Sequence, residues 1–270
     1  MSAVPQSAET QTSQPLLLRH DEGGVTTLTL NRPAQFNSLS EELLAELQAA
    51  LDAIAADTQV RAVVIAGAGK AFCSGHDLKQ MRANHSKEYM QKLFRQCGRV
   101  MQSIISIPHP VIARVHGIAT AAGCQLVAAC DLAVAADVAR FAVSGINVGL
   151  FCATPAVALA RNMGRKQAME MLLTGDFIDA AEAQRRGLVN RVVALEQLDA
   201  EVSKLADSVC AKSAVAVGMG KQMFYKQLEM GLEAAYQLAA ETMACNMMAA
   251  DAGEGIDAFM QKRKPEWKGC

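Results

Sequence analysis

One stretch, residues 111–150, limits the possible folds of this chain more than any other. It opens with a β-branched apolar run at 111–115, which is typical of a buried strand. Small residues follow at 119–124. Apolar runs at 126–129 and 132–135 then predict a helix and a second strand. Strand, turn, helix and strand in so short a span indicate a tight crossover in an α/β fold.

The small residues of this turn have two explanations. At the start of a helix they let a ligand approach the backbone, and the free N–H groups there, with the helix dipole behind them, suit a developing negative charge. Small residues are also what a helix needs to pack closely against a strand, and such motifs more often reflect packing than binding. The turn alone leaves both explanations open.

Length and charge exclude several classes of protein. The chain has 270 residues, 51% of them hydrophobic, which suits one large domain or one domain with an appendage. Lys and Arg total 26 against 27 Asp and Glu, so nothing indicates a nucleic-acid partner. No stretch of about 18 or more apolar residues predicts a membrane span. Residues 1–14 lack a basic start, an apolar core and Arg, so we expect a disordered tail rather than a targeting signal.

Cysteine usage points to a reducing compartment. The chain has eight cysteines, none of them in a CxxC pair, and most lie among apolar residues. We therefore expect reduced thiols, a cytosolic location and no metal site. A catalytic cysteine stays open at this point.

The remaining pattern divides the chain in two. A hairpin is predicted over 16–30, a helix from Ser40 to about 56, a strand at 61–66, a long helix at 87–107 and a last strand at 188–193. Shorter helices are predicted at 154–163, 166–174 and 180–186. Beyond 195 only helices are predicted, at about 196–211, 214–229, 233–249 and 252–262. We expect a tail at 1–14, an α/β core at 15–195 and a helical region at 196–270.

Several motifs follow one another along the chain. They are LNRP at 30–33, FCSGHDL at 72–78, the turn at 117–124, CDLAVAAD at 130–137, MLLTG at 171–175, EAQRRGLV at 182–189 and EGIDAFMQKRKPEW at 254–267. In this order they resemble the crotonase, or enoyl-CoA hydratase/isomerase, superfamily over nearly the whole chain. FCATPAVALAR at 151–161 is most similar to the subgroup of enoyl-CoA hydratase domain-containing proteins.

The resemblance implies a fold and a chemistry. The fold is an α/β, ClpP-like spiral of ββα units with a C-terminal helical trimerisation region. The chemistry acts on acyl-CoA thioesters through an enolate, with the thioester oxygen held by two backbone N–H groups. These correspond to His76 and Ala122, with Gly123 beside the latter. Such donors each contribute about 3–4 kcal/mol and do not depend on the side chain.

Two positions break the family pattern. A hydratase of this family needs two glutamates that flank one water as base and acid. Their positions hold Gln125 and Gly145 in this chain. An amide can hold a water but cannot accept its proton, and glycine offers no side chain. These substitutions argue against efficient hydration by the two-glutamate mechanism.

Three activities remain open. The first is a decarboxylase or thioesterase-like enzyme that uses the oxyanion hole alone; Gly145 would let a bicarbonate sit as base, as in family members that build naphthoyl-CoA. The second is a non-catalytic acyl-CoA-binding module. The third is a weak hydratase whose water is held by Gln125 and nearby polar groups. Those groups are Ser144, Asn147, Cys152 and Thr154.

The resemblance also implies partners. Ala34 stands where the family often has a CoA-binding lysine, and Lys79 is placed to meet phosphates instead. Phe259 and Lys262 resemble residues that reach the CoA of a neighbouring protomer. We therefore expect an acyl-CoA partner in a homotrimer or hexamer, without nucleic acid or membrane. CoA enters only as part of the substrate, and no other cofactor and no metal is expected.

Overall fold

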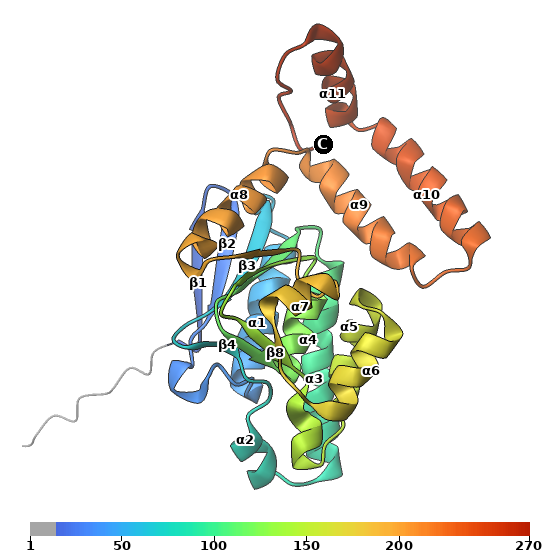
Figure 1. Ribbon diagram of the computed structural model, residues 1–270. Coiled ribbons are helices and arrows are strands. Elements are labelled where there is room, and N and C mark those ends of the chain that lie inside the picture. Colours follow the sequence, from blue (N-terminus) through green and yellow to red (C-terminus); the bar gives the residue numbers. More distant parts are fainter. Residues whose placement is uncertain (1–14) are drawn as a thin grey trace, which may run out of the picture.

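The computed structural model describes residues 15–270, which form two β-sheets surrounded by helices and a C-terminal helical arm (Figure 1). The strands are β1 Leu17–Glu22, β2 Val25–Leu30, β3 Ala62–Gly67, β4 Ala71–Cys73, β5 Val111–Val115, β6 Ile118–Thr120, β7 Leu132–Ala136, β8 Arg140–Ala142, β9 Ile178–Asp179 and β10 Arg191–Val193. The helices are α1 Glu41–Ala55, α2 Leu78–Ala83, α3 Lys87–Ser106, α4 Ala122–Ala129, α5 Ala153–Asn162, α6 Arg165–Thr174, α7 Ala180–Arg185, α8 Leu198–Cys210, α9 Ala214–Gln227, α10 Leu232–Met247 and α11 Ala250–Gln261. Short 3₁₀ helices span Pro33–Gln35, Ser144–Val148 and Leu195–Gln197.

The first sheet has six strands in the order β1-β2-β3-β5-β7-β10, and the second has four in the order β4-β6-β8-β9. Among the described strands of the first sheet, the β1–β2 hairpin is the only antiparallel pair. β5 and β7 pair in parallel with α4 between them in sequence, which confirms the predicted crossover. α4 touches strands of both sheets and is buried along its whole length.

The structure corrects the predicted turn at 119–124. Its first half is strand β6, and the helix begins at Ala122 rather than at 126. β6 pairs with β4 and β8, which lie far from it in sequence. Three-residue strands leave no recognisable alternation, so only tertiary pairing defines them. The same reason explains why β8 and β9 were missed and why the last strand is shorter than predicted.

The long helices form where their sequence signals lie. Ser40 Oγ accepts a hydrogen bond from the Leu43 N–H at the start of α1, and Ser86 Oγ accepts one from Tyr89 at the start of α3. Both helices bury an apolar stripe in the main core beside the first sheet. The short helix α2 was not predicted, although Asp77 supplies an N-cap for it by accepting from the N–H groups of Lys79 and Gln80.

Four C-terminal helices are present as predicted, but they differ in what they contact. α8 packs Leu198, Val202 and Ala206 against the sheet face opposite the main core. α9, α10 and α11 project away from the sheets (Figure 1). α9 is fixed to the core by Lys221, whose Nζ lies 2.7 Å from Asp131 Oδ2. The predicted division at 195 stays a prediction; the arm that projects begins at α9.

Two further predictions concern the N-terminal tail and the absence of a membrane span. The predicted tail, residues 1–14, lies outside the described residues. Within residues 15–270, no helix combines the length and apolar character needed to cross a membrane.

Candidate active site

The peptide between Gly75 and His76 has its direction fixed by the neighbouring segment. The Leu39 N–H donates to the Gly75 carbonyl at 2.8 Å, and the Asp77 N–H donates to the Leu39 carbonyl at 3.3 Å. No cis peptide occurs in residues 15–270, and the C=O and N–H of a trans peptide point in opposite directions. The His76 N–H therefore points away from Leu39. Within the same residues it donates no hydrogen bond.

Gly75 brings this peptide against the start of α4. Its φ is +91°, which favours glycine, and a Cβ built on it would lie 2.8 Å from Ala121 Cβ and 3.2 Å from the Ala122 nitrogen. A side chain at this position would push the two segments apart. Two backbone segments distant in sequence, the 75–76 peptide and the α4 N-terminus, thus meet at Gly75.

The first N–H groups of α4 have no hydrogen-bond partner within residues 15–270. Ala121 has a φ of +49° and makes no side-chain cap, and the first N–H bonded back along the helix is that of Gln125, to the Ala121 carbonyl. The N–H of Ala122 is one of those that a helix cannot satisfy internally, and the helix dipole gives this end a partial positive charge. At Gly123 a Cβ would lie 2.1 Å from the Cys73 carbonyl oxygen, so only glycine lets α4 pack this closely on β4.

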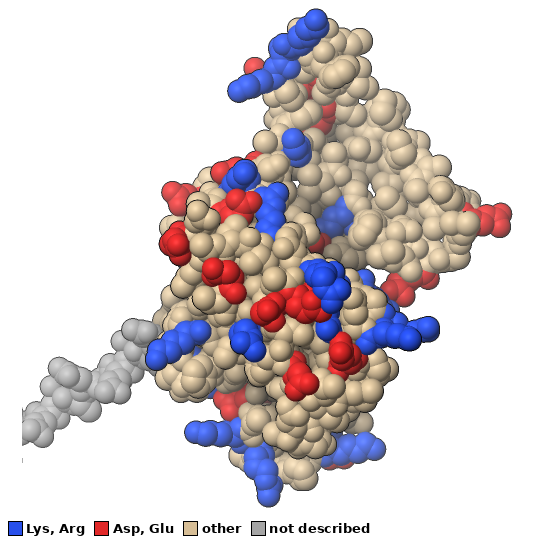
Figure 2. All heavy atoms as spheres, in the orientation of Figure 1, with Lys and Arg blue, Asp and Glu red and all other residues tan. Residues whose placement is uncertain are grey.

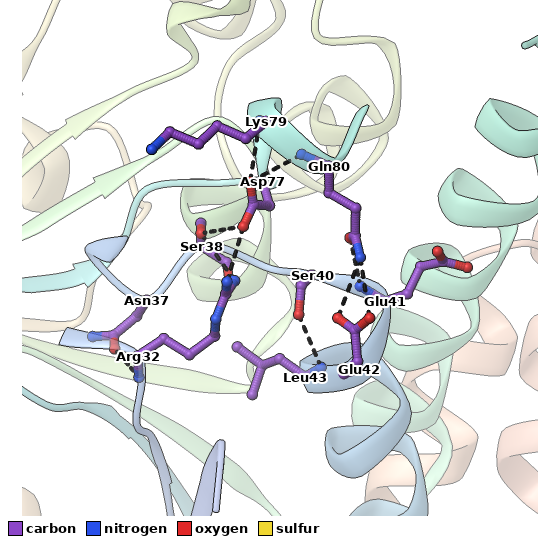
Figure 3. Close-up of polar contacts among 10 residues, drawn as sticks. All are labelled: Arg32, Asn37, Ser38, Ser40, Glu41, Glu42, Leu43, Asp77, Lys79 and Gln80. Atoms are coloured by element: carbon purple, nitrogen blue, oxygen red, sulfur yellow. Dashed lines mark hydrogen bonds and ion pairs between the residues drawn. The ribbon is translucent and has the colours of Figure 1, made fainter. Parts of the chain in front are cut away.

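An ion pair holds the loop that carries His76 (Figure 3). Arg32 Nη2 lies 2.9 Å from Asp77 Oδ2, with both side chains about 15% exposed, and Arg32 Nη1 donates to the Ser38 carbonyl at 2.6 Å. Burial by itself would raise the pKa of Asp77, but the hydrogen bonds and charge of Arg32 outweigh it and hold that pKa below its usual range. The carboxylate therefore stays ionised and keeps α2 capped.

Asn37 completes this support from the other side. It is fully buried with a φ of +55°, and its Oδ1 accepts from the Arg32 N–H at 2.9 Å. Its Nδ2 donates to the carbonyls of Ala68 and Ala71, both at 2.8 Å. Arg32 and Asn37 were not predicted as supports of the site. The Asn-Arg-Pro motif was the sequence feature that pointed to them. Their hydrogen-bond and ion-pair partners are too distant in sequence to be predicted from that motif.

A cavity of about 230 Å³ opens beside this corner. Its lining is mostly apolar and includes no charged residue. The lining residues are Ser74, His76, Leu78, Met81, Phe94, Ala121, Ser144, Gly145, Val148, Leu150, Phe151, Cys152, Ala153, Thr154 and Pro155. Of the predicted residues it brings together His76, Gly145, Ser144, Cys152 and Thr154; Ala122, Gly123, Gln125 and Asn147 are not part of the lining.

The two positions of the missing glutamates differ in their surroundings. A Cβ at Gly145 would lie 2.6 Å from the Leu150 carbonyl oxygen and 2.7 Å from Cys152 Sγ, so this position has no room for a side chain. Gln125 is 4% exposed, and within residues 15–270 its Oε1 has no hydrogen-bond partner. Neither of the two positions carries a carboxylate, and position 145 has no space for one.

Two titratable groups of the lining are neutral. Burial lowers the pKa of His76 to about 4, so its ring is uncharged at neutral pH. The ring packs edge-on against Phe94 with 5.4 Å between centroids. Burial raises the pKa of Cys152, which keeps the thiol protonated and argues against a thiolate nucleophile.

The predicted CoA-binding residues do not gather in one chain. Ala34 and Lys79 are both exposed, and Lys79 lies in the first turn of α2, directly after the loop that carries His76. Phe259, which is 84% exposed, and Lys262 lie at the end of α11, at the opposite end of the molecule from α2 (Figure 1). These two residues could meet the same ligand as Lys79 only from a second copy of the chain.

Strands of both sheets contact a short buried helix, and the N-terminus of this helix meets the 75–76 peptide beside an apolar cavity. The enoyl-CoA hydratase/isomerase family matches residues 20–270, and the chain belongs to this family, also called the crotonase family. Enoyl-CoA hydratase domain-containing protein 3, mitochondrial, of Xenopus laevis is 45% identical over 253 residues, which cover 94% of this chain and 86% of that protein.

Solved structures agree in fold. A crystal structure of enoyl-CoA hydratase from Mycobacterium smegmatis is 62% identical, with a TM-score of 0.93, and the match covers 94% of this chain and 99% of that one. The crystal structure of human enoyl-CoA hydratase domain-containing protein 3 is 43% identical, with a TM-score of 0.91, over 94% of this chain and all of that one. These matches confirm the predicted crotonase fold and the resemblance to the domain-containing subgroup.

Proposed function

We propose that this protein binds an acyl-CoA thioester and polarises its carbonyl with the backbone N–H groups of His76 and Ala122. One observation carries the proposal: Gly75 places the 75–76 peptide against the α4 N-terminus, beside an apolar cavity. Two N–H donors aimed at one oxygen stabilise the enolate that forms when charge moves onto it, and each contributes about 3–4 kcal/mol. These donors belong to the backbone, so they do not depend on which side chains the two positions carry.

The same site is not expected to hydrate enoyl-CoA efficiently. Hydration needs a base and an acid on one water, and neither Gln125 nor Gly145 supplies a carboxylate. The cavity lining contains no Asp or Glu to replace them. We therefore expect chemistry that needs the oxyanion hole alone, with a non-catalytic acyl-CoA-binding module as the alternative.

Mass spectrometry of acyl-CoAs incubated with purified protein tests this proposal. The panel contains crotonyl-CoA, malonyl-type CoAs and saturated esters, each with and without bicarbonate. Loss of carbon dioxide or of CoA would support a repurposed enzyme, and tight binding without change would support the binding module. Hydration of crotonyl-CoA at an ordinary hydratase rate would contradict the inference drawn from positions 125 and 145.

We further propose that the protein works as a homotrimer or hexamer, with CoA held between copies. No residue of α10 is buried in the single chain. Large exposed apolar side chains cover the arm: Phe224, Leu228, Leu232, Tyr236, Met243, Met247, Met248, Ile256, Phe259 and Met260. The face of α9 and α10 in Figure 2 carries few charged atoms compared with the core. Apolar patches of this kind mark interaction surfaces.

In such an assembly Lys79 would meet the CoA phosphates, while Phe259 and Lys262 of a neighbouring copy would close the site. Ala34 would offer no charge. Light scattering during size-exclusion chromatography tests the oligomer, and a monomer would exclude it. A fall in CoA affinity for Lys79→Ala or Lys262→Ala tests the contacts.

The cytosolic location also stays a proposal. The vertebrate relatives carry "mitochondrial" in their names, which describes those proteins. Fractionation of cells that express the chain with a C-terminal tag would decide between the two compartments.

A further inference from the structure

A strap of chain, residues 263–269, turns back beside α11 and is tied to that helix by Glu254 (Figure 1). Arg263 Nη1 and Nη2 lie 2.6 and 2.8 Å from the two oxygens of the Glu254 carboxylate, and Glu254 Oε1 also accepts from the Glu266 N–H at 2.7 Å. The hydrogen bonds from Arg263 lower the pKa of Glu254 to about 2, so both partners are charged at neutral pH. One carboxylate therefore closes the turn that follows α11.

The far end of the strap is fixed as well. Asp251, in the first turn of α11 and 1% exposed, accepts from the N–H groups of Lys268 and Gly269 at 2.7 and 3.2 Å. Between these two attachments, Trp267 Nε1 donates to the carbonyl of Ala211, the C-cap of α8, at 2.8 Å. The strap thus runs antiparallel to α11 and links this helix to α8, so α11 cannot shift without breaking these bonds.

Lys262 stands at the bend between α11 and the strap, in a conformation that favours a different residue. Its φ is +55°, in the left-handed region where a helix usually ends on glycine. A cation at the end of a helix also suits the dipole, but Arg263 beside it already supplies one. The Lys262 side chain is exposed and forms no ion pair within residues 15–270, and Phe259, three residues earlier, is 84% exposed. The described chain thus fixes the Lys262 backbone and leaves its charge unpaired.

We propose that Glu254 is a positioning residue for CoA binding: it fixes the turn from which Lys262 extends, and so directs the Lys262 ammonium group to the CoA phosphates of a neighbouring copy. The inference rests on the proposed function, which brings Lys262 to the CoA of another copy. Lysine is a flexible point charge, so a contact made from a moving turn would lose more conformational entropy on binding than one made from a fixed turn. Glu254 itself touches no ligand in this arrangement.

Three roles of Glu254 predict different results when its carboxylate is removed. As a charge, the carboxylate opposes phosphate binding, so its loss would strengthen CoA binding. As a purely structural group, its loss would lower the stability and leave the CoA affinity of the folded protein unchanged. As a positioning residue, its loss weakens CoA binding, and does so only while Lys262 is present.

Calorimetric titration with free coenzyme A separates these roles, with light scattering at the same protein concentration to record the assembly of each variant. Lys262→Gly suits the left-handed turn and removes the contact, so it should fold and bind CoA about tenfold more weakly, as the loss of one charged hydrogen bond would give. Glu254→Ala should weaken CoA binding by a similar factor. The double variant Glu254→Ala with Lys262→Gly should bind no more weakly than Lys262→Gly alone, because both changes remove the same contact.

Asp257→Ala is the matched control, because it removes an exposed carboxylate of the same helix whose side chain forms no hydrogen bond within residues 15–270; its CoA affinity should be unchanged or slightly higher. Glu254→Gln keeps an acceptor for the Glu266 N–H and should lose part of the affinity, and it replaces Glu254→Ala if the latter does not fold. Unchanged or stronger CoA binding in the Glu254 variants, or an equal loss from Glu254→Ala with and without Lys262, would overturn this inference alone. Unchanged binding in Lys262→Gly would instead contradict the CoA contact of the proposed function.

Discussion

Two regions of the candidate site differ in the chemical groups that they supply. At the donor corner, Gly75 and Gly123 let two backbone segments meet, and the Arg32–Asp77 ion pair holds the loop in place. At the other corner, Gly145 is crowded by Leu150 and Cys152. Gln125, which is not part of the cavity lining, occupies the other position where the resemblance implies a glutamate. The geometry therefore supports the proposed backbone donors, whereas neither position proposed for a glutamate carries a carboxylate.

The largest expected effect comes from closing the donor corner. Gly123→Ala places a Cβ 2.1 Å from the Cys73 carbonyl oxygen, so α4 must move away from β4. Overpacking a tight core typically costs 1–3 kcal/mol, and contact with backbone puts this variant at about 3 kcal/mol or more. Urea unfolding measures the loss. Gly98→Ala, in α3 with open space around its Cβ, is the matched control and should be neutral or stabilising.

A restored glutamate pair tests the other corner. In Gln125→Glu combined with Gly145→Glu, the side chain at 145 meets the Leu150 carbonyl, so we expect a loss of about 2 kcal/mol in stability and no hydratase activity. Conversion of crotonyl-CoA is followed by absorbance, with Gln125→Glu alone as the control. Full hydratase activity in the double variant would mean that segment 145–152 moves easily to admit the new side chain. It would also mean that the site lacks nothing for hydration except the two carboxylates.

Lowering the pH should reduce the stability of the folded protein through protonation of His76. Its pKa of about 4 in the folded protein lies below the ordinary value of 6.5, because burial disfavours the charged ring. The unfolded chain therefore binds this proton more readily, and stability falls as the pH drops from 6.5 toward 4, by about 2 kcal/mol at pH 5. His76→Phe should lack this component. The difference between the two urea-unfolding profiles across pH isolates it, and parallel profiles would contradict the assignment.

The smallest effect concerns the ion pair. Asp77→Asn removes the charge that faces Arg32 but keeps a side-chain oxygen that can cap α2. Because both partners are partly exposed, the expected loss is about 1 kcal/mol of stability. The infrared carbonyl band of a bound ¹³C-labelled thioester should also shift less than in the wild type, since the His76 N–H is held less firmly. An unchanged band would limit the pair to a structural role.

The sequence by itself determined the elements whose signals are local. Ser40 and Ser86 mark the starts of α1 and α3, and the apolar runs at 111–115 and 132–135 became the parallel neighbours β5 and β7. The motif order was sufficient to predict the family, whereas the assignment of the two glutamate positions to 125 and 145 stays a prediction. These signals can be read from the sequence because capping residues and periodic apolar residues act over one or two turns.

The tertiary structure alone decided what depends on contacts distant in sequence. The pairing of β6 with β4 and β8, the ion pair between residues 45 positions apart, and the meeting of Gly75 with Ala121 have no local signature. The same holds for Gly145: the sequence shows a glycine, but only the fold around Leu150 and Cys152 shows that a larger side chain has no room there. Close packing is set by atoms from several segments at once, and a one-dimensional pattern does not record their distances.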